Sequence, residues 1–130
     1  ADIPASIRRA DPNIESCYAA ADLVVCRAGA SSICELALFA KPAVLIPLPT
    51  AADNHQAVNA ELLQHAQAAV HFPQSEATPD KLASTLNDWL ENPEKWNLMG
   101  QNLHDFARPQ AADDLVELLR ETLKRRQKKP

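Results

Sequence analysis

The sequence predicts an α/β fold, a partial doubly wound parallel sheet with a helical C-terminal end. Three short apolar segments predict buried strands, at residues 23–26, 43–46 and 68–72. Each is followed by a segment in which apolar residues recur every three to four positions, as in an amphipathic helix. Because strand and helix alternate, the strands are expected to run parallel and to be joined by right-handed crossovers.

The first third of the chain predicts a helix, a strand and a second helix. The first helix is predicted over residues 13–21, with four residues spaced for one buried face: Ile14, Cys17, Tyr18 and Ala21. The run at 23–26 is apolar and contains two valines, which suits a strand covered on both faces. Gly29 then breaks the strand. A second helix is predicted from Ser31 or Ser32 to Ala40, because Ile33, Leu36 and Ala37 follow helical spacing.

The middle of the chain predicts a strand, a helix and a last strand. Lys41-Pro42 ends the second helix, and prolines close the strand at 43–46. Asp53 is expected to cap a third helix that runs to about Gln64, with Val58, Leu62 and Ala66 facing inward. After the strand at 68–72 the chain is predicted to be helical over 78–90, 93–107 and 112–127.

The composition is that of one globular domain and argues against general nucleic-acid binding. The 130 residues are 46% hydrophobic, enough to bury one core, and carry a formal net charge of −4. Nucleic-acid binding needs a basic field that displaces phosphate counterions. A solvated helix end is preferred over a lipid or nucleic-acid site for the basic C-terminal run, which contains Lys124, Arg125, Arg126, Lys128 and Lys129.

The cysteines and the hydropathy pattern predict a cytoplasmic protein. Cys17, Cys26 and Cys34 are odd in number, and the last two lie in apolar surroundings typical of buried reduced thiols. No segment approaches the roughly 18 apolar residues of a membrane span, so any membrane contact is expected to be peripheral. No cofactor is expected, and no metal ion either, because the histidines and cysteines lack the spacing of a zinc site.

The chain is expected to form a single domain over residues 1–130 that is a piece of a larger protein. It opens with Ala1, and its first twelve residues contain no clear strand. Three strands are also few for a crossover sheet. These features predict that the complete sheet contains further strands.

A turn rich in small residues follows the first predicted strand. It contains Gly29, Ser31 and Ser32, and Glu35 comes one helical turn later. A helix N-terminus offers unpaired N–H groups and a partial positive charge, glycine permits close approach to the backbone, and serine adds a donor. This combination suits a diphosphate. The alternative is that Ser32 and Glu35 only cap the helix as a Ser-x-x-Glu box.

A second polar group follows the next predicted strand, at the start of the third helix. Gln56 and Asn59 are three residues apart, so their amides project from one helix face toward the strand ends. Neutral amides both donate to and accept from sugar hydroxyls. The alternative is an ordinary solvated helix start. Because ligands bind at the carboxyl ends of the strands in such sheets, the two groups together predict one binding site.

Three linked motifs resemble the C-terminal portion of the MurG family of glycosyltransferases: ADLVVCRAGASSICEL at residues 21–36, KPAVLIP at 41–47 and HQAVNA at 55–60. The resemblance is strong from about Asp11 to Phe72 and looser over the helical remainder. It implies the Rossmann-like C-terminal half of a two-domain GT-B enzyme. That enzyme is an inverting, metal-independent hexosyltransferase that moves N-acetylglucosamine from UDP-N-acetylglucosamine to lipid-linked muramyl pentapeptide in peptidoglycan synthesis.

The resemblance also implies a role for each residue that matches the family motifs. Glu35 would accept hydrogen bonds from the ribose hydroxyls. The turn residues Ala30, Ser31 and Ser32 would lie against the diphosphate. The contacts to N-acetylglucosamine would come from His55, Gln56 and Asn59. The acceptor would bind an N-terminal domain that this chain lacks, at the cytoplasmic face of the inner membrane, so no catalytic base is named and the chain alone is expected to be inactive.

The sequence also departs from the family and leaves other functions open. Ala40 and Gln67 stand where relatives often have a helix-ending glycine, which predicts local strain. A related transferase with another lipid acceptor, such as a sugar lipid or a dolichol-linked glycan, would share this donor end. A non-catalytic binding module that serves as a subunit would also keep the fold.

Overall fold

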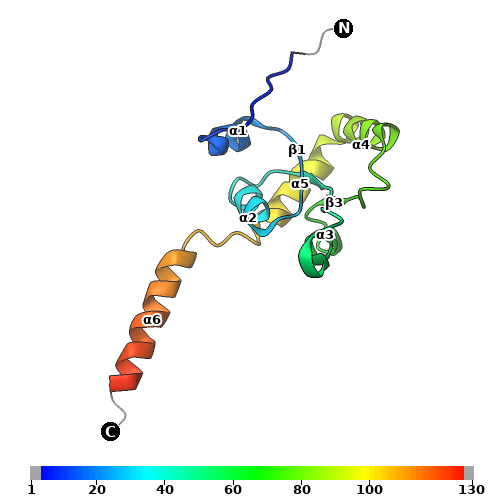
Figure 1. Ribbon diagram of the computed structural model, residues 1–130. Helices are drawn as coiled ribbons and strands as arrows, with labels where there is room; N and C mark the ends of the chain where they lie inside the picture. Colours follow the sequence, from blue (N-terminus) through cyan, green and yellow to red (C-terminus); the bar gives the residue numbers. More distant parts are fainter. Residues whose placement is uncertain (1–3, 128–130) are drawn as a thin grey trace.

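A computed structural model describes residues 4–127 and shows a small parallel sheet between helices (Figure 1). In chain order the elements are α1 (Ile14–Ala20), β1 (Val24–Cys26), α2 (Ala30–Leu38), β2 (Ala43–Leu45), the 3-10 turn η1 (Ala52–Asn54), α3 (His55–His65), β3 (Val70–His71), α4 (Pro79–Glu91), α5 (Pro93–His104) and α6 (Ala111–Gln127).

The strands pair in the order β1-β2-β3 and all run parallel, which confirms the predicted fold class. Val25 of β1 is the partner of Val44 in β2, and Leu45 of β2 is the partner of His71 in β3. Consecutive strands are therefore neighbours, and each crossover passes through one helix. This arrangement brings the carboxyl ends of β1 and β2 to the same edge of the sheet.

Helices cover both faces of the sheet. Because successive side chains of a strand point to opposite faces, β2 contributes to the cores on both sides. Leu45 joins one buried cluster with Leu36 of α2 and Leu63 of α3. Val44, between Ala43 and Leu45, points to the opposite face and packs with Trp96 and Met99 of α5. Trp96, read from the sequence as a core residue or as a residue packing against a further domain, lies in this second core and is 1% exposed. The two clusters make the sheet doubly wound.

Two sequence-based assignments of buried residues are wrong. In α1, Ile14 and Cys17 are exposed and Tyr18 packs against the core, because none of the helices and strands in residues 4–127 packs extensively against α1. Cys34 is also exposed. It lies on α2 beside the buried face formed by Leu36 and Ala37, so helical spacing rotates its side chain toward solvent.

Two helices end in a left-handed residue that is not glycine, as the sequence predicted. Ala40 has φ 51° after α2, and Gln67 has φ 54° after α3. Each position costs conformational energy that glycine would avoid. The carbonyl of Ala40 in addition packs directly against Gly100 of α5. This contact fixes how closely α5 approaches the end of α2.

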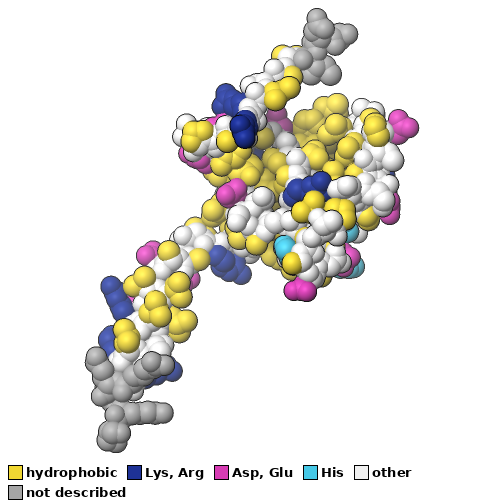
Figure 2. All heavy atoms as spheres, viewed as in Figure 1, with side chains coloured by type: hydrophobic (Ala, Val, Ile, Leu, Met, Phe, Trp, Pro, Cys, Tyr) yellow, Lys and Arg dark blue, Asp and Glu magenta, His cyan; other side chains and the backbone are white. Residues whose placement is uncertain are grey.

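Helix α6 extends away from the body of the molecule (Figure 1). Hydrophobic side chains run along it among charged ones (Figure 2), and Leu115, Leu119 and Leu123 are exposed. The helix confirms the predicted element at 112–127. Lys128 and Lys129 of the basic run lie outside the described residues. Within residues 4–127, no helix is both long and apolar enough to cross a membrane.

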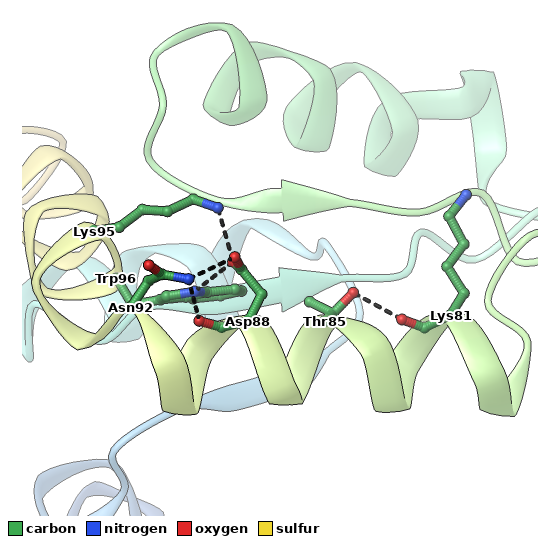
Figure 3. A network of polar contacts seen from close by, with 6 residues as sticks. All are labelled: Lys81, Thr85, Asp88, Asn92, Lys95 and Trp96. Carbon is green, nitrogen blue, oxygen red and sulfur yellow. Dashed lines mark hydrogen bonds and ion pairs between the residues drawn. The ribbon is translucent and has the colours of Figure 1, made fainter.

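A polar network joins the end of α4 to the start of α5 (Figure 3). The carboxylate of Asp88 accepts hydrogen bonds from Lys95 Nζ at 2.7 Å and from Trp96 Nε1 at 3.1 Å. Asn92 Nδ2 donates to the other carboxylate oxygen at 3.0 Å. The hydrogen bonds from Lys95 and Trp96 lower the pKa of Asp88 below its ordinary value. The network thereby orients the indole of the buried Trp96.

We expect Asp88 to contribute to loss of stability in acid. Its pKa is lowered in the folded state, so its stabilising contribution is present above the pKa of the unfolded chain and is lost as the pH falls below about 4. Asp88→Asn should therefore have a shallower decline of unfolding free energy than the unmodified chain over that range, measured by urea unfolding at several pH values. Parallel declines in the two proteins would contradict this role.

Candidate functional site

The turn between β1 and α2 leaves a helix N-terminus open. Gly29 is the N-cap of α2, in extended conformation, and no side chain caps the helix. The first bond within the helix runs from Ile33 N to Gly29 O at 3.1 Å. The N–H groups of Ala30, Ser31 and Ser32 therefore have no acceptor inside α2. The capping box predicted for Ser32 and Glu35 is wrong, because α2 begins earlier and places Ser32 inside its first turn.

The amide of Asn59 connects the two polar groups predicted from the sequence. Asn59, on α3, donates from Nδ2 to the carbonyl of Ala28 at 3.2 Å. Ala28 is fully buried and directly precedes the N-cap of α2. Asn59 also lines a cavity of about 130 Å³ with Ala30 and Phe106. The start of α3 is therefore fixed beside the open end of α2.

Gln56 holds the loop that follows β2. Its Oε1 accepts a hydrogen bond from the backbone N–H of Leu48 at 3.0 Å. Both Gln56 and Asn59 are half-buried and point toward strand ends, as the sequence predicted. Gln56 Nε2 and Asn59 Oδ1 take no part in these two bonds. Each amide thus braces a strand-end loop through one of its two polar atoms.

The inward face of α3 differs from the one predicted. Val58 and Leu62 are 59% and 58% exposed, whereas Ala60 and Leu63 are buried. Gln56 and Asn59 share the inner side with the buried residues because their amides bond to the strand-end loops. Ala66 is also exposed. The prediction failed because it chose the apolar set Val58, Leu62 and Ala66, whereas the inner face combines the apolar Ala60 and Leu63 with the bonded amides of Gln56 and Asn59.

The turn before α3 has unusual backbone geometry. Asp53 and Asn54 both lie in the left-handed region, with φ of 51° and 55°. Asn54, not Asp53, is the N-cap of α3, and its side chain makes no cap bond. Asp and Asn tolerate this region better than other residues with side chains. His55 is exposed, and its Nδ1 lies 2.6 Å from the carbonyl of Ala52, so the ring faces its own turn.

Arg27 ties the ends of β1 and β2 together, a role that the sequence did not reveal. Its guanidinium donates to the carbonyls of Ile46 and Pro47, at 3.1 Å each. The same side chain lines a cavity of about 360 Å³ with Gln74 and Ala77 at the carboxyl edge of the sheet. The position of an arginine directly after a buried strand was the available signal.

Glu35 lies on α2 one turn beyond the open N-terminus and is half-buried. Ser31 is exposed and Ser32 is half-buried. The seven predicted contact residues thus come from only two segments, the first two turns of α2 and of α3. Among residues 4–127, no group of three or more His, Cys, Asp or Glu is arranged to hold a metal ion.

These segments form a site that can bind an anion next to a polar ligand group. The open end of α2 offers N–H donors and a partial positive charge. The amide of Asn59 is bonded beside this end, at Ala28, and Glu35 lies one turn along α2. Such an arrangement can offer donors to an anion and hydrogen-bonding groups to hydroxyls next to it.

Comparison with known proteins identifies relatives over most of the chain. The chain is 45% identical over 106 residues to the UDP-N-acetylglucosamine–N-acetylmuramyl-(pentapeptide) pyrophosphoryl-undecaprenol N-acetylglucosamine transferase of Myxococcus xanthus, covering 82% of this chain and 28% of that enzyme. The enzyme of the same name from Stutzerimonas stutzeri is 46% identical over 101 residues, which cover 78% and 28% of the two chains. The chain spans only 28% to 31% of the length of such curated relatives.

Solved structures agree with the observed fold. MurG of Acinetobacter baumannii superposes with a TM-score of 0.78 and 34% identity, over 89% of this chain and 33% of that protein. The glycosyltransferase VinC superposes with a TM-score of 0.67 over 92% of this chain and 31% of its own, but at 17% identity it supports the fold alone. Residues 3–125 match the family model described as the glycosyltransferase family 28 C-terminal domain. The chain therefore belongs to glycosyltransferase family 28, as a C-terminal domain of that family.

Proposed function

We propose that this chain is the donor-binding domain of an enzyme that transfers N-acetylglucosamine from UDP-N-acetylglucosamine to undecaprenyl-pyrophosphoryl muramyl pentapeptide. The relatives at 45% and 46% identity carry the name of that activity. The observation that carries the proposal is the bond from Asn59 to Ala28, which sets the Asn59 amide of α3 beside the open N-terminus of α2.

The geometry supports a division of the donor among three parts of the site. The diphosphate lies against the N–H groups of Ala30, Ser31 and Ser32, where the helix dipole favours negative charge. Glu35 accepts hydrogen bonds from the ribose hydroxyls, since a carboxylate accepts from two donors at once. The sugar faces the start of α3, where Gln56 and Asn59 lie inward and His55 lies at the exposed end.

The same arrangement assists the departure of UDP in the reaction. When the glycosidic bond to the sugar breaks, negative charge grows on the diphosphate. Fixed N–H groups at a helix N-terminus stabilise that charge without reorganisation. The lipid-linked acceptor and the group that takes its proton belong in this proposal to another part of the enzyme. Because the acceptor carries a lipid, we place the enzyme peripherally at the cytoplasmic face of the membrane.

The amides of α3 provide the test of the sugar assignment. Gln56→Ala and Asn59→Ala should each lower the affinity for UDP-N-acetylglucosamine about three- to tenfold, because a hydrogen bond to the sugar is lost. The affinity for UDP should fall less. Titration calorimetry with both ligands measures the difference.

A matched control comes from the other end of the same helix. Gln64 Oε1 accepts from His71 N at 3.2 Å, so Gln64→Ala also removes a bracing amide of α3, but away from the site. It should leave both affinities unchanged. If Gln56→Ala and Asn59→Ala lower the affinities for UDP and for UDP-N-acetylglucosamine by the same factor, the amides act only as braces and the sugar assignment is wrong.

A further inference from the structure

Tyr18 attaches helix α1 to helix α2. It is the single tyrosine of the chain and is half-buried. Its ring centroid lies 5.9 Å from that of Phe39, which follows the last residue of α2, with the ring planes tilted by 37°. It is also the α1 residue that packs against the core cluster of the α2 face. The contact places the phenol ring along one particular face of α2.

That face of α2 also carries Glu35. Glu35 precedes Phe39 by four residues, so the two side chains lie one turn apart on the same side of the helix. The phenol of Tyr18, which lies against Phe39, is therefore placed on the side of α2 that carries the Glu35 carboxylate. Burial, together with this neighbouring hydrogen-bond acceptor and negative charge, raises the pKa of Tyr18 to about 12, and Cys26 adds a smaller effect. At neutral pH the phenol therefore keeps its proton and is a donor.

We propose that Tyr18 is a positioning residue for nucleotide binding, whose hydroxyl orients the carboxylate of Glu35 toward the ribose. This inference rests on the ribose role given to Glu35 under Proposed function. A free glutamate side chain samples several rotamers, and ligand binding must select one. An ionised carboxylate has about four acceptor positions, so one can hold the Tyr18 proton while others accept from a ribose diol.

The affinity test uses Tyr18→Phe, which keeps the ring on Phe39 and removes only the hydroxyl. UDP affinity should fall about three- to tenfold, the range expected for one hydrogen bond, while the melting temperature stays within a few degrees. In the Glu35→Ala background the same substitution should cause no further loss, because its effect passes through Glu35. The proposal would be overturned if Tyr18→Phe did not lower UDP affinity in the unmodified chain, or if it lowered UDP affinity equally in both backgrounds.

A spectroscopic titration tests the contact without any nucleotide. Because the chain has one tyrosine, the ultraviolet absorbance of phenolate formation reports Tyr18 alone. Glu35→Gln should move this titration to lower pH, since it removes the negative charge beside the phenol, while Cys26 remains in both proteins. An unchanged titration would overturn the proposal.

The two measurements separate this proposal from the function on which it rests. If Glu35→Ala lowers UDP affinity and Tyr18→Phe does not, only the positioning role of Tyr18 is wrong, and the ribose assignment stands. If Glu35→Ala leaves UDP affinity unchanged, the ribose assignment fails and the positioning role fails with it, even where the titration of Tyr18 shifts. We expect UDP affinity to fall in both single variants and to be no lower in the double variant than in Glu35→Ala.

Discussion

Trp96→Ala is expected to destabilise the chain by about 3–5 kcal/mol, a large part of the 5–15 kcal/mol typical of a domain. Trp96 is 1% exposed and packs with Val44 and Met99 on the α4 side of the sheet. Truncation leaves a cavity that the surrounding sheet and helices cannot close. It also removes the Nε1 donor from the Asp88 carboxylate. Urea unfolding followed by circular dichroism measures the loss.

Trp96→Phe is the matched control for this prediction. It keeps a large ring in the core and loses mainly the hydrogen bond to Asp88, so we expect a smaller loss of about 1–2 kcal/mol. A cost of less than about 1 kcal/mol for Trp96→Ala, as for a surface position, would show that α5 does not pack on the sheet as described.

Gly100→Ala is expected to destabilise the chain by about 1–3 kcal/mol, the usual cost of overpacking. A methyl group at Gly100 would lie 2.2 Å from the carbonyl oxygen of Ala40. Alanine is favoured over glycine inside a helix by about 1 kcal/mol, which opposes the loss. The clash prevails because its partner is backbone, held in a left-handed turn at Ala40. Thermal unfolding should show a lower melting temperature.

The second glycine of the chain provides the control. A methyl group at Gly29 would meet nothing within 4 Å, and the φ of −69° suits any residue. Gly29→Ala should therefore cost no more than about 1 kcal/mol, from a poorer helix cap. A rise in melting temperature for Gly100→Ala would mean that helix propensity prevails and that α5 lies farther from the end of α2.

Most of the fold could be predicted because strong local signals mark each element. The apolar runs at β1 and β2 are short, contain β-branched residues and end at Gly29 or Pro47, so strand type and parallel pairing followed directly. Thr78 before Pro79 also marked the start of α4 correctly, and its Oγ1 accepts from Lys81 N at 3.3 Å. Such signals depend only on neighbours in the sequence.

The buried sides of α1 and α3 could not be predicted, because they depend on which other elements pack against each helix. The sequence pattern predicted that Val58 and Leu62 face inward. The inner face of α3 instead carries Gln56 and Asn59, whose hydrogen-bond partners are an N–H group and a carbonyl of distant loops. Those partners exist only once the sheet has formed. The shared face of Gln56 and Asn59 was nevertheless predicted correctly, because residues three apart lie on one side of a helix.

The structure also shows contacts between segments that are distant in the sequence. Arg27 bonds to carbonyls 19 and 20 residues away, and the Tyr18 ring of α1 packs beside Phe39 at the end of α2. Both contacts join elements that are adjacent only in the folded sheet.

The most direct test of UDP-sugar binding at this sheet edge is calorimetric titration of UDP against the unmodified chain, Glu35→Ala and Glu94→Ala. Glu94 is an exposed carboxylate on α5 and serves as the matched control. Removing charge-assisted hydrogen bonds to the ribose should lower UDP affinity at least about tenfold in Glu35→Ala, with little change in melting temperature, because Glu35 caps no helix. Glu94→Ala should bind UDP as the unmodified chain does. Equal UDP affinity in the unmodified chain and in Glu35→Ala would contradict the assignment of this site.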